Sequence, residues 1–267
     1  MTTLEFTSKF TELQNNNTNQ VSEFDPKKHN LLGSNSIKIQ HSNEFGKGEY
    51  NTAIMYLAPY DLSGKQVCPF ASAGCSSGCL NTAGRGGMIK TGEYTNAIQN
   101  ARIRRTRFFY SDRQGFLEQL IKEVASHESK CKAEGSTPAI RLNGTSDIAL
   151  ETVYPELFAM FPNVIWYDYT KFPINKRTNL PKNYTLTFSR SEANHDQVLE
   201  NLRAGRNVAI VFSTKKSEEL PSQYLGYEVI NGDIHDMRFL DPKGVIVGLK
   251  AKGDARKDTS GFVVQVI

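Results

Sequence analysis

The segment of residues 67–88 (VCPFASAGCSSGCLNTAGRGGM) contains three of the chain's four cysteines at a spacing that suits metal chemistry. Cys68, Cys75 and Cys79 follow a C-x6-C-x3-C pattern, and the small residues between them let a backbone wrap closely around a bound group. Thiolates are soft ligands that suit zinc or an iron–sulfur cluster. Because three protein ligands leave one coordination position open, we expect a metal centre of the catalytic kind here.

The metal at these cysteines has two candidates. An open-cornered four-iron cluster fits three clustered thiolates. Zinc fits equally well, with Cys75 and Cys79 as the close pair, Cys68 as the third ligand and a remote His or Cys131 as the fourth. The other interpretations are a disulfide and ordinary buried thiols. The low cysteine number and the lack of a signal-peptide pattern argue against a disulfide, and the clustering argues against simple packing.

Length and composition set the broad class of protein. With 267 residues, of which 39% are hydrophobic, the chain is long enough for one large domain. A net charge of +4 is compatible with a nucleic-acid partner. No apolar run reaches the roughly 18 residues that cross a bilayer. We therefore expect no membrane association and a reducing cytoplasm as the setting, and the sequence leaves the oligomeric state open.

The chain divides into an arm and a domain. Residues 1–35 are polar and rich in Asn, Thr and Lys, which predicts a loosely ordered N-terminal arm with one short helix at residues 4–13. Residues 36–267 predict a single domain. Its first segment, residues 36–40, alternates in polarity and predicts a strand.

Beyond residue 50, apolar runs typical of strands alternate with helical patterns. Helices are expected at residues 92–109, 112–133, 154–161 and 195–204; Asp112 and Gly135 supply typical cap signals for the second. Strands are expected at residues 51–57, 138–142, 164–169, 184–188, 207–213, 227–230 and 245–249. This alternation predicts an α/β fold with a parallel sheet, as a complete or partial βα barrel or, second, as an open doubly wound sheet.

Short polar clusters follow most of the expected strands. In a βα barrel the carboxyl ends of the strands meet at one mouth, so we expect these clusters to surround one pocket, with the cysteine loop at its rim. The carboxylates and the lysine are candidates for proton transfer or nucleophilic attack, namely Asp147, Asp233, Asp236 and Lys171. The candidates for substrate or cofactor binding are Asn143, Gly144, Ser146, Tyr169, Arg190 and Arg238.

The chemistry of this set indicates the kind of substrate. Cations suit phosphate groups, and an aromatic ring such as Tyr169 suits stacking on a base. We therefore expect a nucleotide or a nucleic acid as the partner. The chain lacks the Walker, G-x-G-x-x-G, G-x-S-x-G and H-E-x-x-H patterns, which removes the usual support for phosphate-loop, dinucleotide, esterase and zincin functions.

The cysteine segment, read as C-P-x-A-S-x-G-C-x3-C-L-x-x-A-G-R, resembles that of a group of bacteriophage proteins. The later segments RLNGTSD, YDYTK, LTFSRSE, NVAIVF, GDIHDMRFLD and VGLKAKG resemble the same group, over roughly residues 51–264. A phage origin implies the cytoplasm of the host cell as the location.

The chain is also similar, more weakly, to radical S-adenosylmethionine enzymes, although their usual spacing is C-x3-C-x2-C. That resemblance implies that Cys68, Cys75 and Cys79 hold an iron–sulfur cluster. It also implies that Asn143, Gly144, Ser146 and Asp147 approach S-adenosylmethionine.

A further similarity is to the barrel transglycosylases that exchange a base in tRNA or phage DNA. It implies a structural zinc and an aspartate nucleophile, with Asp147, Asp168 and Asp233 as candidates, although the transglycosylase cysteine pattern C-x-C-x2-C is absent. The sequence thus favours an enzyme, either a radical-type metalloenzyme or a base-exchanging transferase acting on a nucleotide or a nucleic-acid base. The remaining alternative is a metal-stabilised binding protein without catalytic activity.

Overall fold

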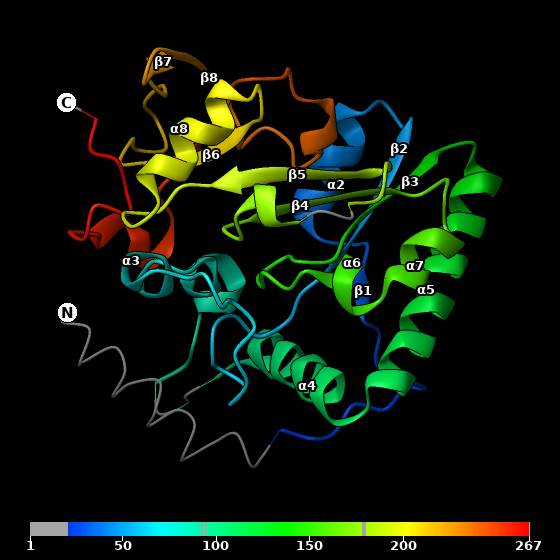
Figure 1. Cartoon of the computed structure of the whole chain (residues 1–267). Coiled ribbons are helices and arrows are strands. Elements are labelled where there is room, and N and C mark those ends of the chain that lie inside the picture. Colours follow the sequence, from blue (N-terminus) through cyan, green and yellow to red (C-terminus); the bar gives the residue numbers. More distant parts are fainter. Residues whose placement is uncertain (1–20, 92, 94, 178–179, 267) are drawn as a thin grey trace.

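The computed structural model of the protein describes residues 21–91, 93, 95–177 and 180–266. In this part of the chain nine strands form one sheet in the order β1-β2-β3-β4-β5-β6-β9-β8-β7 (Figure 1). The strands are β1 (Leu32–Gly33), β2 (Tyr50–Met55), β3 (Thr137–Arg141), β4 (Ile165–Thr170), β5 (Tyr184–Ser189), β6 (Val208–Phe212), β7 (Gln223–Tyr224), β8 (Tyr227–Asn231) and β9 (Ile246–Lys250).

The sheet is mostly parallel. All pairs from β2 to β8 are parallel, and only the short edge strands β1 and β7 pair in the antiparallel sense. The pairings among the described strands run from one edge to the other and do not close the sheet. The expected α/β class is therefore confirmed in the form of an open, mostly parallel sheet.

Helices connect the parallel strands. They are α2 (Ile37–Phe45), α3 (Ala73–Ser77), α4 (Ala97–Ser111), α5 (Arg113–Glu134), α6 (Leu150–Val153), α7 (Pro155–Met160) and α8 (His195–Arg203). The short 3-10 helices are η2 (Leu80–Thr82), η3 (Gly84–Gly87), η4 (Ile174–Lys176), η5 (Arg238–Leu240) and η6 (Gly253–Lys257). The α5 helix forms as the sequence predicts, because the Asp112 side chain accepts a hydrogen bond from Gly115 N and Gly135 ends the helix in the left-handed conformation.

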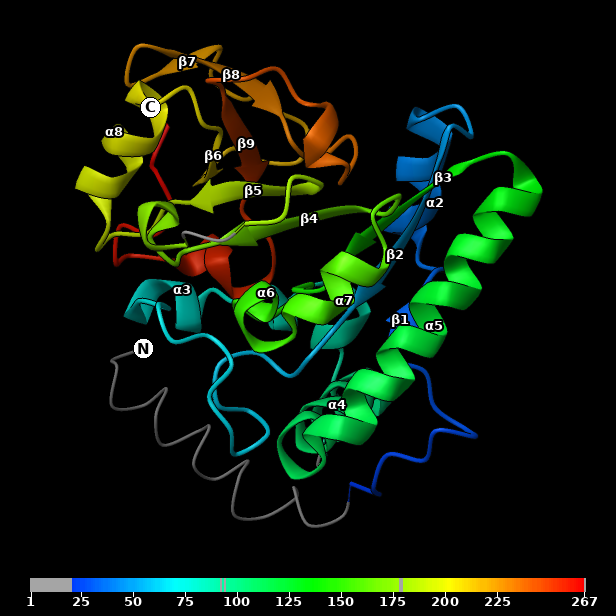
Figure 2. The same ribbon diagram turned by 45° about the vertical axis from the view of Figure 1, so that its right-hand side comes forward.

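The strand register shows that one face of the sheet carries the main hydrophobic core. Side chains opposite each other in parallel neighbours point to the same face. Ala53, Ile140, Trp166 and Tyr184 lie in one such row, and they belong to a core formed with α5 and α7. The same face continues through Phe188, Val208 and Ile246, which pack with α8. The connecting helices therefore cover one face, and the turned view shows α5 and α7 on that side (Figure 2).

The opposite face is covered by α2 and by residues 232–241. Arg141 and Tyr167 lie on this face, and Tyr167 packs edge-on against Phe239 of η5. Met237 and Arg238 are buried between these elements. Ser42 of α2 accepts a hydrogen bond from Asp236 N at 2.9 Å. This face is thus filled with polypeptide near its centre rather than left as a pore.

One local prediction is wrong. Residues 36–40 were expected as a strand but begin α2, because the Ser36 side chain accepts a hydrogen bond from Ile39 N and caps a helix. The alternation over residues 36–40 is too short to distinguish the two-residue period of a strand from the 3.6-residue period of a helix. The burial of Ile39 and Ser42 follows helical spacing.

The expected arm of residues 1–35 is described only in part. The helix expected at residues 4–13 lies outside the described residues. Residues 21–35 contact the domain: Leu31 is fully buried, β1 pairs with β2, and Arg104 donates a hydrogen bond to Ser22 O. Arg105 likewise donates to Asn30 O, so two of the arginines on α4 bind this segment.

Candidate functional site at the cysteine loop

The cysteine loop follows β2, the first parallel strand, at its carboxyl end. Cys68 lies before α3, Cys75 lies within α3 and Cys79 immediately precedes η2. All three side chains are half-buried, and none forms a disulfide. Tyr60 N donates a hydrogen bond to the Cys68 sulfur at 3.3 Å, and the Cys68 thiol donates to Thr145 O at 3.7 Å.

The three thiols influence one another electrostatically. Burial raises the pKa of Cys68 well above its usual range, and negative charge on Cys79, Asp147 and Cys75 would raise it further. Burial likewise raises the pKa of Cys79 to about 11, again with a contribution from Cys75. The neutral forms of Cys68 and Cys79 are therefore favoured, and a bound metal would reverse this preference.

Glu192, just after β5, fixes the position of α3. Its carboxylate accepts hydrogen bonds from Gly74 N at 2.7 Å and from Ser72 Oγ at 2.8 Å, and Ser72 Oγ accepts one from Cys75 N at 3.2 Å. Gly74 is required at this contact, because a Cβ there would overlap Ser260 and Phe262. The end of β5 and the C-terminal segment thus hold the turn that carries Cys75.

Lys171 and Asp147 adjoin the thiols. Asp147 accepts hydrogen bonds from Thr170 Oγ1 and Lys171 N, each at 2.7 Å, and burial raises its pKa. Burial opposes the charged form of Lys171, but negative charge on Cys75 and Asp147 outweighs it and raises the lysine pKa. The ammonium also lies 5.7 Å from the centre of the Phe262 ring.

The turn of residues 143–147 is tied to the cysteine loop, since Asp147 N donates to Val67 O at 2.8 Å. The Asn143 side chain accepts from Ser146 Oγ and Ile148 N and donates to Asp168, so its hydrogen bonds stabilise the turn itself. At Gly144 a Cβ would clash with the Tyr56 ring and Met55 O, which accounts for the glycine by packing.

Arg190 lies on the C-terminal side of this group. Its guanidinium donates hydrogen bonds to Gly261 O and Phe262 O, both at 2.8 Å. Phe262 in turn belongs to a small apolar cluster against which Cys75 packs. Arg190 therefore anchors the segment that backs the cysteine helix.

The remaining predicted residues belong to a second group, on the face of the sheet that α2 and residues 232–241 cover. Asp236 is buried between Arg141, at 2.9 Å, and Lys38, at 2.7 Å. Burial would raise the pKa of Asp236, but these two cations outweigh it and hold the pKa below its usual range. The Arg141 guanidinium lies 4.7 Å from the centre of the Tyr169 ring, which therefore has a cation on one face.

Arg238 and Asp233 complete this second group. Arg238 is buried, pairs with Asp241 at 3.3 Å and donates a hydrogen bond to His235 O at 2.6 Å. Asp233 lies further out, where its carboxylate pairs with Lys252 at 2.7 Å and accepts from Lys250 N.

The structure thus brings one set of predicted residues to the cysteine loop and places another set in ion pairs. The first set lies together around the cysteine loop and consists of Cys68, Cys75, Cys79, Asp147, Lys171 and the segment that Arg190 binds. Asp236, Arg238 and Tyr169 form the second group. Sequence reasoning missed Glu192, Arg141 and Lys38, whose partners lie far away in the chain; the cluster SRSE after a strand was the one signal for Glu192.

The present side-chain arrangement is not a metal shell. Within residues 21–91, 93, 95–177 and 180–266, no group of three or more His, Cys, Asp or Glu side chains is arranged to hold a metal ion. The donor chemistry nevertheless suits one, because three thiols adjoin each other. Cys131 is fully buried in the last turn of α5, with its sulfur 3.7 Å from His127 Nε2, so its contacts are those of a packing residue.

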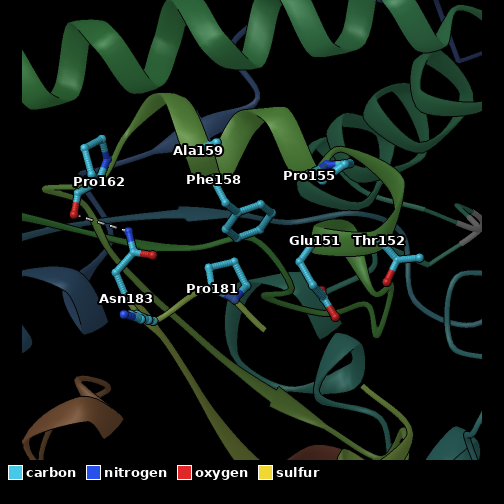
Figure 3. A pocket seen from close by; sticks show the side chains of 9 residues that line it. Glu151, Thr152, Pro155, Phe158, Ala159, Pro162, Pro181 and Asn183 are labelled. Carbon is cyan, nitrogen blue, oxygen red and sulfur yellow. Dashed lines mark hydrogen bonds between the residues drawn. The ribbon is translucent and has the colours of Figure 1, made fainter. Parts of the chain in front are cut away.

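A concave pocket lies elsewhere, beside α6 and α7 (Figure 3). It is lined by Phe158, three prolines and Lys182, together with Glu151, Thr152, Ala159 and Asn183. The Glu151 carboxylate is already paired with Arg177. The pocket therefore offers mainly apolar surface and lacks the convergent polar groups typical of an active site.

Fold and site together define an α/β protein with a mostly parallel sheet and a three-cysteine loop at its carboxyl edge. The chain belongs to the family described as Gene product 88, whose sequence model matches residues 16–266. This family fits the resemblance to bacteriophage proteins. No curated protein and no solved structure matches the chain. No helix in the described ranges is long and apolar enough to cross a membrane.

Proposed function

We propose that the protein is a metalloenzyme in which Cys68, Cys75 and Cys79 bind an iron–sulfur cluster, and that it modifies a nucleotide or a nucleic-acid base. The observation that carries this proposal is the position of three mutually interacting thiols in the loop after the first parallel strand.

The order of the strands supports a barrel-like arrangement. From β2 to β6 each strand pairs with the next in sequence, and the connecting helices pack on one face. A doubly wound sheet would reverse its order at a switch point and carry helices on both faces. Sequential strand order with the crossover helices on one face is the pattern of a partial βα barrel, in which the carboxyl edge carries the active site.

The chain's own residues have definable parts in this site. A bound cluster would supply electrons for radical chemistry, in the manner of the radical S-adenosylmethionine enzymes that the sequence resembles. Lys171 places a positive charge beside the thiols, which favours their deprotonated, metal-binding form. Asp147 positions Lys171 through the lysine backbone N–H. Glu192 orients the turn that carries Cys75.

The second candidate is a base-exchanging transglycosylase with a structural zinc. Asp168 favours it, because burial raises the pKa of this carboxyl to about 6, a range suited to a general acid or base. However, Asp168 accepts hydrogen bonds from Asn143 N and Tyr184, so its carboxylate is already occupied. The thiol cluster therefore favours the iron–sulfur metalloenzyme over the transglycosylase.

Two cysteine variants test the metal site. We expect Cys75→Ala, purified anaerobically, to lose bound metal, because it removes one of three ligands. Cys131→Ala removes a thiol of the same chemistry from a buried helix and should retain the metal content of the unaltered protein. Equal loss in both variants, or retention in both, would contradict the assignment. Metal content is measured by iron, sulfide and zinc analysis per chain.

A further inference from the structure

Residues 62–91, which surround the cysteine site, contain no acidic residue. The chain as a whole has 28 Asp and Glu in 267 residues, so about three would be expected in a stretch of this length. Lys65, Arg85 and Lys90 are all exposed in it. We call residues 62–91 the acid-free segment. Its charge is entirely positive, which suits an anionic partner.

The same segment exposes large apolar side chains. Met88 is 72% exposed and Leu80 is 53% exposed, whereas Phe70 and Ile89 are 41% and 40% exposed. Phe70 packs edge-on against Phe172, the neighbour of Lys171, with ring centres 4.6 Å apart. Four large exposed apolar side chains within residues 70–89 favour a binding surface. This surface borders the cysteine site directly.

The segment is held in place by a dense set of hydrogen bonds. The Asn96 side-chain nitrogen donates to the carbonyl oxygens of Arg85, Gly86 and Met88, each at 3.0 Å. Gln99 donates to Gly86 O at 2.8 Å, and Arg102 donates to Asn81 at 2.6 Å. Because the α4 helix fixes η2 and η3 in this way, the apolar side chains are presented to solvent by an ordered backbone.

We propose that the acid-free segment is a surface for single-stranded nucleic acid. Lys65, Arg85 and Lys90 would contact phosphates, while Phe70, Met88 and Ile89 would contact unstacked bases. A single strand combines regularly spaced negative charge with accessible base faces, which matches this mixture of cations and apolar side chains. A duplex hides its base faces within the stack. The inference rests on the proposed function, since it supplies the substrate of the same site.

Binding of a fluorescent oligonucleotide tests the surface. The probe is a labelled oligo-dT of about 12 nucleotides, measured by anisotropy between about 50 and 200 mM NaCl. We expect Arg85→Glu/Lys90→Glu to weaken binding at least tenfold and to reduce the salt slope by about 1.4, since each single-strand phosphate contact contributes about 0.7. Met88→Ser/Ile89→Ser should weaken binding several-fold and leave the salt slope unchanged.

Lys215→Glu/Lys216→Glu is the matched control, because it changes the net charge equally at exposed positions outside the segment. The proposal predicts binding close to that of the unaltered protein. It is overturned if oligo-dT does not bind at the lowest salt, if a duplex binds as tightly, or if the control weakens binding as much as Arg85→Glu/Lys90→Glu. Metal content is measured on the same samples. Metal without oligonucleotide binding refutes this inference alone, whereas a protein without metal refutes the proposed function.

Discussion

The predicted side chains fall into two kinds: some adjoin the thiols, and others form buried ion pairs away from the cysteine loop. Lys171 and Asp147 contact the thiol group and the backbone beside it, whereas Asp236 and Arg238 are paired with Arg141 and Asp241. Removing one partner of a buried pair leaves an uncompensated charge, at a typical cost of about 3–5 kcal/mol. Substitutions at Asp236 or Arg238 therefore report on folding before they report on catalysis.

His235 makes the stability of the fold depend on pH. Burial, with help from Arg238, lowers its pKa to about 4, although Asp236 acts in the opposite direction. The unfolded chain takes up a proton near pH 6.5 and the folded chain does not. The contribution of His235 to stability is therefore complete above about pH 6.5 and is lost as the pH falls toward 4, by up to about 1 kcal/mol per pH unit.

We expect His235→Gln to lose less stability than the unaltered protein between about pH 6.5 and pH 4.5, as measured by urea unfolding. Asp241, whose Oδ1 lies 3.8 Å from His235 Nε2, acts in the opposite direction, because burial raises its pKa to about 6 and it stabilises the fold as the pH falls through that value. Parallel pH profiles for the two proteins would contradict a depressed histidine pKa.

At the scale of elements, α3 depends on a contact that spans more than a hundred residues. Its five residues make too short a helix to be stable alone, and Glu192 supplies acceptors for Gly74 N and Ser72. This carboxylate orients Cys75 through Ser72 and the Gly74 N–H. Glu192 is accordingly a positioning residue.

We expect Glu192→Ala to reduce metal retention and to lower the free energy of unfolding by about 1–3 kcal/mol, because a charge-assisted pair of hydrogen bonds is lost. Glu192→Gln keeps one acceptor oxygen and should restore part of the metal content. Glu219→Ala, at an exposed loop position, is the control. A Glu192→Ala protein with full metal content would show that α3 is held without this contact.

Local signals in the sequence predicted most elements and missed those with distant causes. The apolar runs at β2, β4 and β6 and the caps of α5 are encoded within a few residues, and the structure confirms them. The helix α2 was missed because its cap, Ser36, outweighs a brief alternation. The contact of Glu192 with Gly74 joins residues 118 positions apart, which no local pattern encodes.

At the scale of the whole molecule, the parallel strands bring several loops to one edge, as the sequence predicted. The loops after β2, β3 and β4 meet through Val67, Asp147 and Lys171. The fold also separates the predicted residues into two groups that composition alone could not distinguish, because α2 and residues 232–241 fill the face opposite the main core. Polar clusters at strand ends indicate which edge of the sheet carries polar side chains. Which of these side chains lack a protein partner depends on the segments that pack against that edge.

Binding of an iron–sulfur cluster by the cysteine loop can be measured on the unaltered protein purified without oxygen. Iron, sulfide and zinc are determined per chain together with the visible absorption spectrum. We expect a brown protein with about four irons and about four sulfides. About one zinc would favour the transglycosylase or structural alternatives, and the absence of all three would contradict the metal site itself.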